Sequence, residues 1–125
     1  AAAADRPFQL RFSGPVALQY ADDAAKIFIA AARAGHQGAA ICNLRNTIVE
    51  VAEVVQLLQQ EIPGARLTYP QNRPLPFPAD LDDSGLRRII GTIPHTSLEV
   101  ATRQTLDRFR ALLAEVKIDL GQLEQ

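Results

Sequence analysis

Several features that would point to a particular class of protein are scarce in this chain of 125 residues. The chain has one cysteine, Cys42, so an internal disulfide is excluded. Cys42 ends the apolar run Ala39–Cys42, which is typical of a small buried core residue, and a free thiol fits a reducing, cytoplasmic compartment. No apolar stretch approaches the roughly 20 residues of a membrane-spanning helix, so we expect no membrane partner.

An excess of charge of one sign is also lacking. The chain has 13 basic and 14 acidic residues, and its net charge is -1. Nucleic acids and anionic membranes select proteins with a basic surface. We therefore expect no nucleic-acid partner.

Apolar residues are plentiful enough for one core. They make up 47% of the sequence, and the length is typical of one domain without internal repeats or a long linker. We predict a single domain over 1–125, with its folded part at 5–115 and frayed tails at 1–4 and 116–125. Ala1 to Ala4 lack the basic start and long apolar region of a signal peptide, so we interpret them as a frayed end or cut point.

The spacing of apolar residues predicts a mixed α/β fold with a small mixed sheet, a β-hairpin and about four helices. The hairpin would join strands 8–12 and 16–20 across the turn Ser13-Gly14-Pro15. The helix after Glu50 follows from an apolar stripe at helical spacing. The other expected elements are a buried strand at 38–44, a brief strand at 66–69, and helices at 22–35, 50–62, 84–90 and 96–113.

Two adjacent carboxylates, Asp22 and Asp23, raise the question of acid–base chemistry. Neighbouring helical residues point about 100° apart, so they converge poorly on one bond. At a helix N-terminus, however, a carboxylate accepts free backbone N–H groups. We therefore predict that Asp22 and Asp23 cap the first long helix, and that Thr96 and Glu99 form a capping box on the last one.

Other chemistry has weak support in the residues. His36, Cys42 and His95 are far apart and form no short-spaced metal-ligand pair, and no G-x-S-x-G motif is present, so we expect no metal site and no catalytic residue in this chain. The proline-rich loop 69–83 is the best candidate for ligand contact. It contains the three residues that we predict to bind substrate, Tyr69, Arg73 and Phe77.

Three segments together resemble the NAD-dependent epimerase/dehydratase family, the extended short-chain dehydrogenases/reductases. "LQYADDAAKIF" is similar to the family's V-x-D-x-A segment, and "AAICNLRNTIVEVAEVVQLLQQEIPGARL" to its y-N-l-G block. "DDSGLRRIIGTIPHTSLEVATRQTLDRFRALL" is similar to the family's closing block. The matches span about residues 8–113, in the family's order and spacing.

The resemblance implies the C-terminal, substrate-side part of such an oxidoreductase. The family's glycine-rich Rossmann loop and Tyr-x-x-x-Lys pair are absent here, because Tyr69 is followed by Arg73 and Tyr20 by Ala24. The resemblance therefore implies NAD or NADP for a full-length enzyme, none bound by this chain alone. It implies a missing N-terminal Rossmann half as partner, or self-association through the face where that half would dock.

Two departures bear on the small-molecule substrate. Family members that act on nucleotide sugars often have Arg-Asp where this chain has Val16-Ala17, and Arg-Pro-Gly-Asp where it has Arg73-Pro74-Leu75-Pro76. These changes favour a smaller sugar, sugar acid or hydroxy compound, with Arg73 contacting an anionic group. The alternative is a stand-alone, non-catalytic ligand-binding or protein-interaction domain.

Overall fold

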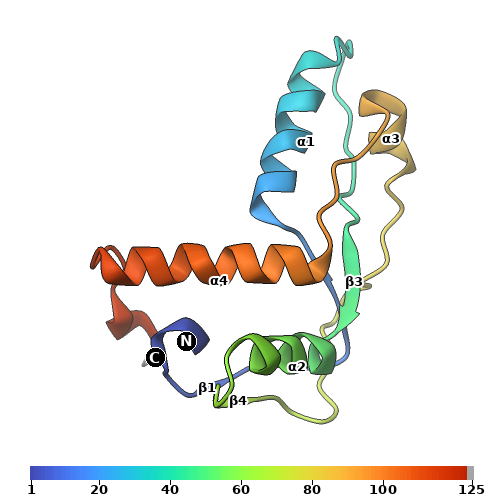
Figure 1. Cartoon of the computed structure of the whole chain (residues 1–125). Coiled ribbons are helices and arrows are strands. Elements are labelled where there is room, and N and C mark those ends of the chain that lie inside the picture. Colours follow the sequence, from blue (N-terminus) through green and yellow to red (C-terminus); the bar gives the residue numbers. More distant parts are fainter. Residues whose placement is uncertain (124–125) are drawn as a thin grey trace.

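The computed structural model describes residues 1–123 and has the mixed α/β fold predicted from the sequence, with four α-helices and two small sheets in this part of the chain (Figure 1). In chain order the elements are η1 (Ala2–Ala4), β1 (Phe8–Gln9), β2 (Pro15–Leu18), α1 (Ala21–Arg33), β3 (Thr47–Glu50), α2 (Val51–Glu61), β4 (Leu67–Thr68), α3 (Ser84–Ile90), α4 (Leu98–Ala114) and η2 (Leu120–Leu123).

Strand pairing differs from the prediction, which had no strand at the position of β3. β2 pairs antiparallel with β3, with Val16 opposite Val49, whereas β1 pairs in parallel with β4. The predicted pairing of 8–12 with 16–20 is therefore wrong, although an antiparallel pair is present. Alternation of apolar residues identifies a strand but not its partner, and here Val16 and Val49 are both buried in the same cluster.

The main core lies where β2, β3 and α2 meet. Val16, Val49, Val51 and Val55 form its buried centre. Partly buried residues pack around that centre, among them Leu10, Phe12, Leu18, Val54, Leu67, Tyr69, Leu75 and Leu98. The change from strand to helix at Glu50 agrees with the predicted helix start, because β-branched Ile48 and Val49 precede it.

The segment 38–44 does not form the predicted buried strand. Ile41 is fully exposed, and Cys42, predicted as a core residue, is only half-buried. The apolar sequence suits a strand, but no strand of residues 1–123 lies beside it to pair with its backbone. The burial of Ile41 and Cys42 was predicted from their hydrophobicity alone, but no element of residues 1–123 covers the Ile41 side chain.

The helix caps also need correction. The N-cap of α1 is Tyr20, so Asp22 and Asp23 lie in its first turn and do not cap it. The N-cap of α4 is Ser97, whose Oγ accepts a hydrogen bond from the N–H of Val100, so Thr96 is not the cap. Glu99 does lie in the first turn of α4, where its own N–H and the Ser97 hydroxyl lower its carboxyl pKa.

Figure 1 shows how the elements are arranged around β3. On one side α4 lies above α2, with the N-terminal turn η1 below α4 and beside α2, and on the other side α1 and α3 flank the extended segment 34–46. Of the predicted frayed tails, residues 2–4 form the turn η1, which contacts α4, and residues 120–123 form the turn η2. Residues 124–125 of the predicted tail lie outside the described part. Among residues 1–123, no helix has the length and apolar character needed to cross a membrane.

The accessible surface is large for the length of the chain. It measures 8595 Å², compared with about 6,600 Å² expected for a compact monomer of this mass. Part of the excess is apolar, since large side chains such as Phe28, Phe77 and Phe109 are 48–68% exposed. The fold therefore leaves apolar surface that its own core does not cover.

Candidate functional site

A cavity of about 700 Å³ lies between α2 and α4. This volume is in the range of small-molecule sites. Its walls are mainly apolar, from Val54, Val55 and Leu58 of α2 and from Ala101, Leu106, Phe109 and Leu113 of α4, and residues 1–4 and Phe8 also line it.

Polar side chains line the cavity where the starts of α1, β3 and α4 meet. They belong to Tyr20, Asn46, Thr47 and Thr96. The Thr47 hydroxyl is 3.2 Å from Nε2 of His95, within hydrogen-bonding distance. Thr102 and Thr105 of α4 and Asp119 add polar groups elsewhere in the lining, and an apolar cavity with a few polar groups is the usual form of a ligand site.

Tyr20 is held at this junction by its hydroxyl. The hydroxyl donates to Oε1 of Gln104 at 2.8 Å and also lies 3.3 Å from Oδ2 of Asp22. Burial and the nearby Asp22 carboxylate raise the pKa of Tyr20 above its ordinary value. The phenol is therefore protonated at neutral pH and suits positioning or hydrogen bonding, not the abstraction of a proton.

Asp23 has a role that the sequence did not reveal. Its side chain is 1% exposed and accepts hydrogen bonds from the backbone N–H of Thr96 and from the Thr96 hydroxyl, the latter at 3.0 Å. Lys26 lies 3.5 Å from the same carboxylate. Asp23 thus joins α1 to the segment before α4, 73 residues later in the chain.

The two adjacent aspartates therefore have different partners. Asp22 is exposed and faces the Tyr20 hydroxyl, whereas Asp23 is buried against Thr96. A pair that shares one proton must bring both carboxylates to the same place. This geometry agrees with the expectation that the pair is not an acid–base couple.

Asn46 carries an unusual polar atom. Its Oδ1 is buried, and no hydrogen-bond partner for it is found among residues 1–123. A buried acceptor without a donor costs about 1–3 kcal/mol. Because Asn46 also lines the cavity, its amide belongs to the candidate site.

The three residues predicted to bind substrate do not line this cavity. Tyr69 packs against the core cluster, and Phe77 is 63% exposed. Arg73 is exposed, but its backbone is fixed: its N–H donates to Oγ of Ser13 at 2.7 Å, and its carbonyl accepts from the Ser13 N–H at 2.9 Å. Buried Ser13 was missed because its position after a strand indicated only a turn.

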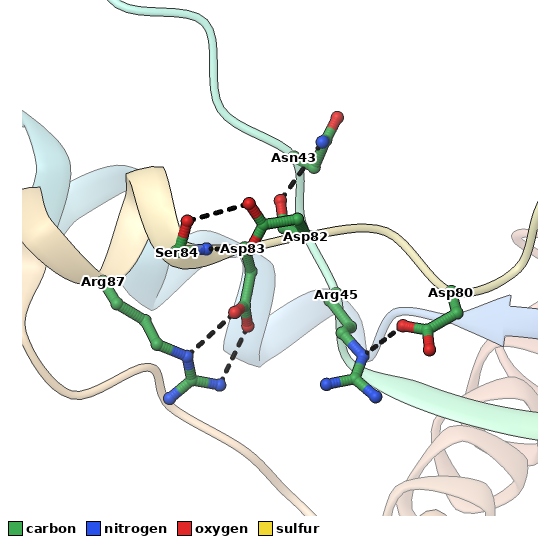
Figure 2. A network of polar contacts seen from close by, with 7 residues as sticks. All are labelled: Asn43, Arg45, Asp80, Asp82, Asp83, Ser84 and Arg87. Atoms are coloured by element: carbon green, nitrogen blue, oxygen red, sulfur yellow. Dashed lines mark hydrogen bonds and ion pairs between the residues drawn. The ribbon is translucent and has the colours of Figure 1, made fainter.

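A polar network ties the segment 43–45 to the start of α3 (Figure 2). Arg45 pairs with Asp80 at 2.8 Å, and the Asn43 amide donates to the Asp82 carbonyl at 3.2 Å. Asp83 receives two hydrogen bonds from Arg87, at 2.9 and 2.8 Å, and these lower the pKa of Asp83.

Asp82 completes the network at the N-terminus of α3. Its carboxylate accepts from the backbone N–H and the hydroxyl of Ser84, and these bonds lower the pKa of Asp82. Each charged group in Figure 2 already has a partner, so the network acts as a connection between segments. Sequence spacing alone could have indicated only the Asp83–Arg87 pair, which lies at i, i+4.

The described residues contain no cluster of three or more His, Cys, Asp or Glu side chains that could hold a metal ion. No protein-family model matches the chain, and a search of curated proteins finds no match. The functional assignment therefore depends on the geometry of the cavity, the exposed apolar surface and the resemblance described above.

Proposed function

We propose that this chain is the C-terminal, substrate-binding part of an NAD(P)-dependent epimerase/dehydratase-like oxidoreductase. The substrate is a sugar, sugar acid or small hydroxy compound. A Rossmann half supplies the dinucleotide site and the Tyr–Lys pair, in a reducing, cytoplasmic compartment. The chain alone shapes a pocket and is inactive.

The observation that carries this proposal is the excess surface. The chain exposes about 2,000 Å² more than a compact monomer of its mass. Obligate interfaces bury about 2,000 Å² or more in total. A second body of polypeptide that covers the exposed apolar residues would account for the excess.

Contacts between distant segments also support the proposal. Asp23, in the segment that resembles the family's V-x-D motif, binds Thr96 in the closing block. Asn43, in the middle block, binds the Asp82 carbonyl at the start of the closing block. The three segments that carry the resemblance are therefore linked to one another in space.

Arg73 is the residue that we assign to an anionic substrate group. Its side chain is exposed, while its backbone is fixed on both sides by buried Ser13. A fixed backbone limits the positions that the guanidinium can reach. A carboxylate or phosphate of the substrate is the natural partner of this group.

The test begins with the gene. We expect the coding sequence before Ala1 to encode, in frame, a glycine-rich βαβ unit and a Tyr-x-x-x-Lys pair. In that full-length protein, Arg73→Ala should raise KM for an anionic sugar acid about tenfold or more, because charge-assisted hydrogen bonds are worth about 1.5–3 kcal/mol.

Steady-state NADH formation with a sugar acid and with a neutral polyol measures this effect. The control is Arg108→Ala, which removes an exposed arginine of α4 and should leave KM unchanged. A start codon at the position of Ala1, or tight NAD binding by the 125-residue chain alone in calorimetry, would contradict the proposal.

One observation favours the second candidate, a stand-alone ligand-binding domain. The cavity has a suitable volume, and polar residues such as Tyr20 and Asn46 line it without help from another chain. Under this alternative the upstream gene encodes no Rossmann unit, so the same gene analysis separates the two functions.

A further inference from the structure

The segment 38–44 has an apolar sequence that suits a β-strand, but no strand among residues 1–123 pairs with it. Within residues 1–123, its backbone takes part in no backbone–backbone hydrogen bond. Of its side chains only Cys42 and Leu44 are half-buried, whereas residues 38–41 and Asn43 are exposed. Cys42 lies close to Gly85 of α3, and the backbone N–H and C=O groups of the segment have no backbone partner within residues 1–123.

Proteins usually protect an unpaired backbone edge with charges or proline. The other strands follow this rule: β2 begins at Pro15, β3 ends at Glu50, and β4 lies between Arg66 and Pro70. Residues 34–44, by contrast, contain no Asp, Glu, Lys, Arg or Pro. The next charge along the chain, Arg45, is paired with Asp80.

A second copy of the same segment fits this edge. Antiparallel pairing is two-fold symmetric, so one segment can be its own partner. The segment carries no charge, so two copies meet without repulsion, and Ile41 adds an exposed apolar side chain on each. The excess of about 2,000 Å² per chain exceeds the roughly 800 Å² per partner of a standard interface.

We infer that two copies of this 125-residue chain associate by antiparallel pairing of segment 38–44, with the two-fold axis at its midpoint, Ile41. Ala40 of each copy then lies opposite position 42 of the other, and the two Ile41 side chains are neighbours at the axis. The inference concerns the isolated chain and does not depend on the enzymatic proposal, so its failure would leave that proposal standing.

The first experiment measures the mass of the purified chain by light scattering over a dilution series. We expect a dimer, and we expect Ile41→Lys to weaken association about tenfold or more, because it sets like charges opposite each other at the axis. The matched control is Val100→Lys, an equally drastic change on α4 at a side chain that is 43% exposed. It should leave the dimer unchanged.

The second experiment tests the register. In a Cys42→Ser background, Ile41→Cys should form a disulfide-linked dimer on mild oxidation, because opposed residues lie within disulfide distance. Ala40→Cys should not, because position 40 faces position 42. Circular dichroism confirms that each variant is folded. A monomer throughout the series, a dimer that survives Ile41→Lys, or equal cross-linking at positions 40 and 41 would overturn the inference.

Discussion

Asp23 shows how one residue can serve a purpose that its immediate sequence does not indicate. Its position at the start of α1 suggested a helix cap, but its carboxylate instead receives two hydrogen bonds from Thr96. Because these partners are 73 residues away, no local pattern predicts them. Ser97 then takes the cap of α4, next to the residue that Asp23 holds.

Substitution of Asp23 tests this role. Asp23→Ala should lower the free energy of unfolding by about 3 kcal/mol, because it removes two hydrogen bonds to a charged, buried group and leaves the Thr96 N–H without its acceptor. Asp23→Asn should cost about 1 kcal/mol, since the amide oxygen can still accept one bond. Urea unfolding measures both values.

Asp22→Ala is the matched control, and we expect a change below about 0.5 kcal/mol because Asp22 is exposed. If Asp23→Ala cost no more than this control, the link between α1 and the start of α4 would not matter to stability.

At the scale of elements, hydrogen bonds and ion pairs connect α3 to a segment that lies outside the main core. The polar network of Figure 2 fixes the start of α3 against residues 43–45. Within it, buried Asp83 accepts two short hydrogen bonds from the exposed side chain of Arg87. Acid should weaken the Asp83–Arg87 pair, because its acceptor is a carboxylate.

The pH dependence of α3 follows from Asp83. The hydrogen bonds from Arg87 lower its pKa in the folded chain below the unfolded value of about 3.9. The carboxylate therefore stabilises the fold above that pH, and this contribution is lost as the pH falls through the lowered pKa. Asp83→Asn should be less stable than wild type at pH 7, and the difference should shrink towards pH 3.

Urea unfolding at a series of pH values measures this difference. Asp107→Asn is the control, because Asp107 is exposed and pairs with exposed Arg110. A difference between wild type and Asp83→Asn that stays constant across the series would show that the Asp83 carboxylate does not stabilise the fold.

At the scale of the whole molecule, the chain exposes more surface than a compact monomer of the same mass. Helices α2 and α4 enclose a large apolar cavity, and side chains such as Phe28, Ile29 and Ile41 face solvent. An apolar surface of this kind marks a binding or docking region. The enzymatic proposal and the strand-pairing inference assign different parts of it to different partners.

A hydrophobic dye reports on the cavity directly. We expect the chain to bind such a dye with a rise in fluorescence, and Phe109→Gln to reduce this signal about twofold or more with little loss of stability, because Phe109 lines the cavity and is 48% exposed. Phe28→Gln is the control, since Phe28 is 68% exposed on α1 and does not line the cavity. Equal loss in both variants would place the dye elsewhere.

The sequence predicted the parts of this fold that depend on local periodicity. The apolar stripe of α2 located that helix, the β-branched residues before it marked its start, and Gly91 marked the end of α3. The loop 69–83 was recognised because its prolines supply no N–H for a helix or sheet. The cavity and its polar residues were not predicted, because they come from separate parts of the chain that range from Ala1 to Leu120.

The sequence by itself determined where the four helices lie, because helices depend on spacings of three and four residues. Only the tertiary structure decided that β2 pairs with β3, that Asp23 binds Thr96 and that the segment 38–44 lies uncovered. Each of these outcomes depends on which distant segment lies alongside. Apolar patterning sets the tendency of a residue to be buried, but burial also requires a neighbour to cover it.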